Sequence, residues 1–162
     1  SVGMHIGYSP QEHQLFEDNI SANIARYDGV DRDKLKKACE LIGLNEQYEN
    51  FSNNQELKVS TDGNNLPGGL KQKISLARAF YGSPKLLVLD EPTSMLDSES
   101  KELFINAIKT FREEKSTIII ATHDKNLLKI ADYVLGIYSG RQKFFDSKQN
   151  LMKQLSKVNT KK

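Results

Sequence analysis

Residues 86–91 read Leu86-Leu87-Val88-Leu89-Asp90-Glu91, four apolar residues followed directly by two acids. A short continuous apolar run is typical of a strand that is buried on both faces of a parallel sheet. Such sheets bind ligands at the carboxyl ends of their strands, where Asp90 and Glu91 stand. One reading is a site in which Asp90 holds Mg²⁺ and Glu91 accepts a proton from water. The other is an ordinary strand end with two solvated acids.

The segments around this strand alternate between helical and strand patterns. Apolar residues recur at helical spacing in several stretches, whereas residues 117–121 are rich in β-branched isoleucine. Residues 47–65 are polar and rich in asparagine, which indicates a loop. We therefore expect an α/β fold with a mainly parallel sheet. The expected helices lie at residues 16–27, 31–43, 70–81, 98–112, 126–131 and 148–155, the strands at residues 5–8, 86–89 and 117–121, and a hairpin at residues 133–138 and 143–145.

Composition excludes several classes of protein. The 162 residues are 38% hydrophobic and 27% charged, which suits a globular domain and is too apolar for a disordered chain. The net charge of +2 argues against a nucleic-acid partner, since the one basic cluster, residues 157–162, is better read as a solvated terminus. Cys39 is the only cysteine and lies in an apolar helical pattern, so we expect a core residue. The chain contains no apolar run near the length that spans a bilayer.

A second motif precedes the acidic strand. Residues 66–72 read Leu-Pro-Gly-Gly-Leu-Lys-Gln and open a predicted helix. Gly68 and Gly69 would let backbone N–H groups approach a phosphate, and the helix dipole would favour its charge. The alternative is a tight turn with Pro67 at the first helical position.

Two further residues stand near the ends of predicted elements. Asp97 directly precedes the helix that begins at Ser98, so it can cap that helix whatever the function. His123 follows the strand at residues 117–121, at the sheet edge predicted to hold the two acids. It could reach a shared ligand there, although a single histidine is more often a surface residue.

Together these motifs resemble the ATP-binding-cassette (ABC) ATPase family in order and spacing. Residues 66–72 look like its signature motif, residues 86–91 like the Walker B strand with the catalytic glutamate, and residues 94–97 like the D-loop. Gln11 looks like the Q-loop glutamine and His123 like the switch histidine. The stretch from Val2 to Arg26 is especially similar to exporter-type cassettes, above all to type I secretion exporters.

The resemblance implies a P-loop NTPase-like parallel sheet with an α-helical subdomain, incomplete because the phosphate-loop half is missing. Residues 1–156 would form the partial ATPase domain, with the helical subdomain at about 12–82 and the later half of the core at 83–156. Residues 157–162 would be a basic tail. The implied partners are a second cassette in a head-to-tail dimer and a transmembrane permease domain, at the cytoplasmic face of the inner membrane.

The resemblance also implies a role for each motif residue in ATP hydrolysis that powers export. The implied cofactors are ATP and Mg²⁺. The implied site comprises Asp90 and Gln11 for Mg²⁺, Glu91, His123 and Gln11 for catalysis, and Gly68, Gly69 and Asp97 for ATP held by the partner cassette.

Three departures from the family pattern matter. The chain has no Gly-x-x-x-x-Gly-Lys-Ser/Thr phosphate loop, the signature serine is Pro67, and Ser60-Thr61 replaces a Gly-Glu pair in a segment that contacts the membrane domain in the family. We therefore expect the isolated chain to be inactive. The alternative is a catalytically silent remnant or interaction module. We also expect the missing strand to leave unpaired edges on both residues 86–89 and 117–121, so that the chain self-associates or is partly molten, with residues 86–121 least protected.

Overall fold

The computed structural model describes residues 5–26, 29–151 and 153. The chain divides into two compact units, residues 1–122 and residues 123–162. The first unit combines a parallel sheet with most of the helices, and the second is built on a hairpin. In the described part of the chain, no helix is both long enough and apolar enough to cross a membrane.

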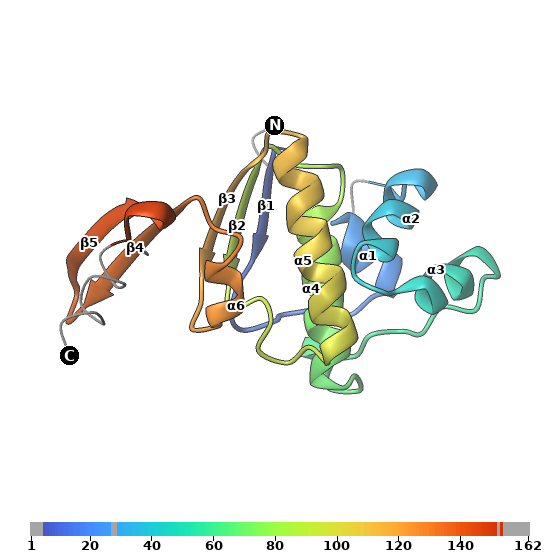
Figure 1. The fold of residues 1–162 in the computed structure, drawn as a ribbon. Helices are drawn as coiled ribbons and strands as arrows, with labels where there is room; N and C mark the ends of the chain where they lie inside the picture. Colours follow the sequence, from blue (N-terminus) through green and yellow to red (C-terminus); the bar gives the residue numbers. More distant parts are fainter. Residues whose placement is uncertain (1–4, 27–28, 152, 154–162) are drawn as a thin grey trace. The chain divides into compact units, whose positions relative to one another are not determined.

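A three-stranded parallel sheet forms the centre of the first unit (Figure 1). Its strands are β1 (Ile6–Ser9), β2 (Leu86–Asp90) and β3 (Thr117–Ala121), in the order β1-β2-β3. Ser9 pairs with Leu89, and Leu89 pairs with Ile120, so all three strands end at the same edge. The expected parallel α/β fold is therefore confirmed.

Two helices, α4 (Gly68–Phe80) and α5 (Ser98–Glu113), cover one face of this sheet (Figure 1). They pack on each other through Phe80, whose ring centroid lies 6.3 Å from that of Phe104 and 5.1 Å from that of Phe111. Helix α4 also crosses β1 very closely. A Cβ atom on Gly7 would stand 2.0 Å from the carbonyl oxygen of Ala79, so only glycine fits there.

The opposite face of the sheet is only partly covered, which corrects the expected burial on both faces. Leu87 and Leu89 point to the helices and are buried. Tyr8 and Ile119 point the other way and are 52% and 55% exposed. The apolar run at β2 was misleading because continuous apolar strands need helices on both faces, and within residues 5–26 and 29–122 α4 and α5 pack on the same face.

The pairing of β2 corrects a second expectation. This strand is central and pairs with β1 on one side and β3 on the other. Its backbone groups are therefore not left unpaired by any missing neighbour. The outer edges of the sheet belong to β1 and β3 alone.

The helical region beyond α4 contains α1 (Ile20–Ala25), α2 (Arg32–Glu40), α3 (Asn45–Ser52) and the 3₁₀ turn η2 (Thr61–Gly63). Helix α1 is shorter than the expected 16–27, because the Asn23 side chain bonds both backbone groups of Phe16 and holds that segment out of the helix. Residue 27 lies outside the described residues. Helix α2 begins after Asp31, whose carboxylate caps it.

The loop expected over residues 47–65 was wrong in part, since α3 and η2 lie within or overlap it. Helix α3 packs against α2, with the Arg32 guanidinium 5.6 Å from the centre of the Phe51 ring. Tyr48 and Phe51 stand one turn apart on α3 and their rings are in contact. Two aromatic residues in a polar helix gave too weak a periodic pattern to be recognised.

The second unit consists of α6 (Lys125–Leu128), β4 (Tyr133–Tyr138) and β5 (Arg141–Ser147). The strands form the expected antiparallel hairpin, and β5 is longer than the expected 143–145. Ser139 and Gly140 both have positive φ, 49° and 69°, as a two-residue hairpin turn requires. Helix α6 is shorter than the expected 126–131. The helix expected at 148–155 lies partly, and the tail at 157–162 wholly, outside the described residues.

Candidate functional site

Three of the predicted site residues lie at the carboxyl edge of the parallel sheet. Asp90 is the last residue of β2 and Glu91 follows it, while Gln11 stands two residues beyond the end of β1. Because β1 and β2 are parallel neighbours in register, the sheet brings these segments to one edge. Gln11 is exposed, whereas Asp90 and Glu91 are half-buried. This edge can therefore present three polar side chains to a ligand.

Glu91 adopts an unusual backbone conformation, with a φ of 43°. A non-glycine residue in this left-handed region is strained, and such strain concentrates at functional sites. Its amide donates to the carbonyl oxygen of Ala121 at 2.9 Å. The Thr122 hydroxyl donates to Glu91 Oε2 at 3.3 Å. The end of β3 and the residue that follows it therefore hold the backbone and the carboxylate of Glu91.

The donor set at this edge fits Mg²⁺. Carboxylate and amide oxygens are hard ligands, and Asp90 and Gln11 supply one of each. The described residues contain no group of three or more histidine, cysteine or acidic side chains placed to hold a metal. Mg²⁺ does not need such a cage, since it commonly takes one or two protein ligands together with waters and substrate phosphates.

The predicted signature turn lies at the N-terminus of α4. The helix begins at Gly68 rather than at Leu70, and Pro67 is its N-cap, not its first helical residue. Pro67 makes no side-chain capping bond. The N–H groups of Gly68 and Gly69 fall in the first turn, where the helix offers them no acceptor. Their approach to a phosphate stays a prediction from the sequence.

The same glycines also permit a close contact with the loop after Glu91. A Cβ atom on Gly68 would stand 3.0 Å from Met95 Sδ, and one on Gly69 would stand 3.1 Å from the Met95 carbonyl oxygen. The predicted signature turn and the predicted D-loop therefore pack against each other. The small size of the two glycines is therefore needed for this packing, whether or not a phosphate binds there.

Asp97 caps α5, as its position in the sequence predicted. Its Oδ1 accepts a hydrogen bond from the Ser100 amide at 2.7 Å. The backbone and side-chain hydrogen bonds from Ser100 lower the pKa of the Asp97 carboxyl below its ordinary value. Asp97 Oδ2 also lies 3.9 Å from Lys73 Nζ of α4, in an ion pair where the aspartate is 65% exposed. The remaining carboxylate surface is open to a partner.

His123 is the first residue of the second unit and directly follows Thr122. Its side chain is exposed. Its approach to the ligand of Asp90 and Glu91 stays a prediction from the sequence.

The sequence reasoning missed Gln72, which is completely buried beneath this site. Its Nε2 donates to the Glu91 carbonyl oxygen at 3.0 Å and to Ser94 Oγ at 3.2 Å, while its Oε1 accepts from the Met95 amide at 2.7 Å. A usable signal existed, because Gln72 lies at helical spacing from Leu76 and Phe80 on the buried side of α4. A polar residue on such a face needs buried partners.

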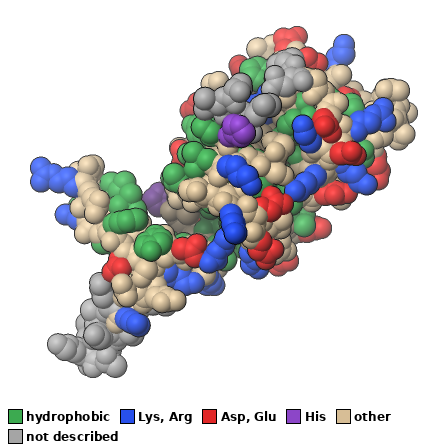
Figure 2. Space-filling view, turned by 90° about the horizontal axis from the view of Figure 1, so that it is seen from above, with side chains coloured by type: hydrophobic (Ala, Val, Ile, Leu, Met, Phe, Trp, Pro, Cys, Tyr) green, Lys and Arg blue, Asp and Glu red, His purple; other side chains and the backbone are tan. Residues whose placement is uncertain are grey.

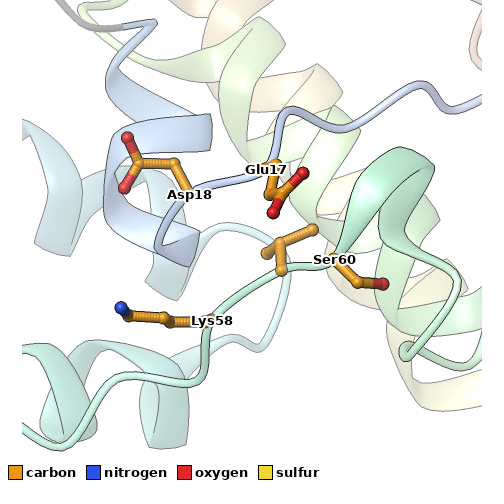
Figure 3. Close-up of a pocket in the computed structure, with 5 residues that line it drawn as sticks. Glu17, Asp18, Lys58 and Ser60 are labelled. Atoms are coloured by element: carbon orange, nitrogen blue, oxygen red, sulfur yellow. The ribbon is translucent and has the colours of Figure 1, made fainter.

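A separate hollow of about 400 Å³ lies in the helical region (Figure 3). Its lining comes from two segments, Glu17 and Asp18 before α1 and residues 58–60 after α3. The Val59 amide donates to the Asp18 carbonyl oxygen at 2.9 Å, and Thr61 Oγ1 donates to Glu17 Oε2 at 3.0 Å. The hollow thus adjoins Ser60-Thr61, where the sequence departs from the family pattern.

On the face in Figure 2, acidic and basic side chains are interspersed.

Comparison with known proteins agrees with the resemblance seen in the motifs. A family model described as ABC transporter matches residues 1–94. The type I secretion system ATP-binding protein PrsD of Rhizobium meliloti (strain 1021) is 32% identical over 156 residues, covering 96% of this chain and 27% of that protein. An ATP-dependent lipid A-core flippase of Saccharophagus degradans is 33% identical over 138 residues, covering 85% of this chain and 23% of that protein.

The solved structure of a bacterial Atm1-family ABC exporter with ATP bound superposes with a TM-score of 0.81 at 27% identity. The match covers 93% of this chain and 27% of the exporter chain. The chain thus spans about a quarter of the length of these relatives. Its parallel sheet and helices correspond to an incomplete P-loop NTPase-like ABC domain. Since the family model covers more than half of its residues, the chain belongs to the ABC transporter family.

Proposed function

We propose that this chain is the later part of an ATP-hydrolysing cassette that powers export across a membrane. The observation that carries the proposal is the strained Glu91, held beside Asp90 at the carboxyl edge of the sheet. An ordinary strand end with two solvated acids has no need of a left-handed glutamate whose amide is bonded to Ala121 of β3 and whose carboxylate is bonded to Thr122 just after it.

Each residue at the edge has a proposed task. Asp90 and Gln11 would hold Mg²⁺, which when bound neutralises the phosphate charge that builds up in phosphoryl transfer. Glu91 would accept a proton from, or orient, the water that attacks the terminal phosphate of ATP. His123 would donate a hydrogen bond to that phosphate. The Thr122 hydroxyl, 3.3 Å from Glu91 Oε2, would fix the direction of the carboxylate.

The signature turn and Asp97 would serve the ATP of a second cassette in a head-to-tail dimer. The N–H groups of Gly68 and Gly69 suit a phosphate, since they lie at the N-terminus of a 13-residue helix. Pro67 adds neither a hydroxyl nor an N–H to this site. The chain would therefore bind the partner's ATP through backbone groups alone. Asp97, exposed beyond its capping bond, would link the two sites.

The membrane partner would be a permease domain, contacted through the hollow between residues 17–18 and 58–60 (Figure 3). Glu17, Asp18 and Lys58 give this hollow charges of both signs. It adjoins Ser60-Thr61, in the segment that contacts the membrane domain in the family. The assembly would then lie at the cytoplasmic face of the inner membrane.

Phosphate release with ATP and Mg²⁺ tests the proposal. The chain alone is expected to release none, because it carries no phosphate-loop motif. Joined to an upstream segment that carries one, it is expected to hydrolyse ATP, and Glu91→Gln is expected to reduce the rate on the order of 10²–10⁴-fold. Glu99→Gln, an exposed acid in the first turn of α5, is the matched control and should keep the full rate.

Two results would contradict the proposal. Glu91→Gln at the rate of the control would remove Glu91 from catalysis. An inactive joined protein that still binds ATP would favour a catalytically silent interaction module.

A further inference from the structure

Gln72 connects the predicted signature helix to the loop that carries Glu91, entirely within the first unit. It lies in the second turn of α4 and its side chain is completely buried. Its side chain makes three hydrogen bonds, all of them to residues 91–95 and none to its own helix. A buried amide with partners 19 to 23 residues away fixes the spacing between two segments rather than the stability of either one.

The bond to Glu91 falls where the backbone is strained. The Glu91 peptide is held at its amide by Ala121 of β3 and at its carbonyl by Gln72 of α4. A left-handed conformation of a non-glycine residue costs free energy and persists only when its surroundings over-determine it. Strand β3 supplies one of these constraints, and Gln72 supplies another.

The bond to Met95 orients the following loop. The Met95 amide donates to Gln72 Oε1 at 2.7 Å, the shortest of the three bonds. The same residue packs over Gly68 and Gly69. Gln72 therefore holds the Met95 amide, and the glycine pair lies against the Met95 side chain and carbonyl.

We infer that Gln72 is a positioning residue, which sets the backbone of Glu91 and of the loop at residues 94–97 relative to the N-terminus of α4. It bonds the backbone carbonyl of Glu91 and not the Glu91 carboxylate. A displacement of α4 by a ligand at Gly68 and Gly69 would be passed through this side chain to Glu91. The catalytic consequence rests on the proposed function, whereas the structural linkage does not.

The linkage is tested on the chain itself by amide hydrogen exchange and NMR. In the wild type, the Met95 amide is expected to be protected, and couplings and chemical shifts should report a left-handed Glu91. Gln72→Met keeps the volume and removes all three bonds. It should speed exchange at Met95 roughly tenfold or more and shift the Glu91 torsion, with little change in the amides of α2.

Ser75→Ala is the matched control, because it removes a different buried bond from the same helix, that of Ser75 Oγ to Ser9 Oγ at 2.9 Å. It should leave Met95 and Glu91 unchanged. An unprotected Met95 amide in the wild type would overturn the inference without any variant. So would Gln72→Met with a lower overall stability and an unaltered Glu91 torsion, since Gln72 would then only fill space.

The catalytic consequence is tested on the chain joined to an upstream segment that carries a phosphate loop, which we call the joined protein. Gln72→Met should reduce kcat roughly tenfold or more while KM for ATP stays within about twofold, because Gln72 lies beneath the reacting groups and not in the nucleotide site. A raised KM at unchanged kcat would contradict positioning. If the wild-type joined protein does not hydrolyse ATP, the proposed function fails, and the exchange experiment still decides the linkage.

Discussion

The two faces of the parallel sheet differ in how completely the first unit covers them. On one face, α4 approaches β1 so closely that Gly7 has no room for a side chain, and Leu87 and Leu89 are buried. On the other, Tyr8 and Ile119 are more than half exposed. The covered face holds residues that fix the site, such as Gln72, whereas the open face consists of apolar residues of the kind that elsewhere lie in a core. Stability and positioning thus depend on the covered face, and we expect the open face to mediate association.

The largest effect is expected from breaking the covered face. Gly7→Ala places a Cβ atom against the backbone oxygen of Ala79, which cannot turn aside as a side chain would. The free energy of unfolding should fall by about 3 kcal/mol. Gly68→Ala is the control, since its new methyl group would meet only the flexible Met95 side chain. It should change stability by less than about 1 kcal/mol. Urea unfolding of both variants measures this, and equal effects would contradict the asymmetry.

The open face and the outer edge of β3 are expected to make the isolated chain self-associate. Residues 117–121 carry no charge, and β3 has an unpaired outer edge in the sheet. Ile119→Lys adds a charge to the exposed face and should weaken association by more than about tenfold. Leu57→Lys changes an equally exposed apolar residue of the helical region and should have little effect. Sedimentation over a range of concentrations distinguishes them, and a monomeric wild type would refute the prediction.

The smallest effect concerns His13, in the segment between β1 and α1. Burial, reinforced by the nearby charges of Arg78 and Lys71, lowers the pKa of His13 from its ordinary value of 6.5. The unfolded chain then binds the proton more readily than the folded one below that value. The free energy of unfolding is therefore highest above about pH 6.5, where His13 is neutral in both states. It falls as the pH drops from there toward the pKa of His13 in the folded state.

Unfolding free energies measured at about pH 7.5 and 5.5 for the wild type and His13→Gln check this sign. The wild type should lose more stability than the variant on acidification. The opposite order would mean that His13 is better accommodated when charged.

Local sequence patterns were enough to predict much of the fold. The apolar run at residues 86–89, the helix that starts after Asp97 and the turn at Ser139-Gly140 depend on spacing and turn chemistry within a few residues. Burial could not be predicted in the same way. Ile119 looks like a core residue in sequence, and its exposure depends on which elements are present to cover β3.

The residues of the candidate site also differ in whether a local sequence pattern could predict them. Asp90, Glu91, Gly68 and Gly69 could be identified because their motifs are contiguous and follow a strand or open a helix. The helical pattern around Gln72 could show only that its side chain is buried and needs a partner, and no pattern marked Thr122. Neither pattern indicates that the partner is Glu91, 19 and 31 positions away.

The most direct test of the account is the association state of the joined protein carrying Glu91→Gln, measured with and without ATP. If Glu91 acts on water while Gly68, Gly69 and Asp97 hold the partner's nucleotide, this variant should bind ATP, fail to hydrolyse it and accumulate as a dimer. Removing ATP should return it to monomer. A variant that turns over ATP at the wild-type rate, or one that binds ATP and stays monomeric at every concentration, would contradict a site shared between two cassettes.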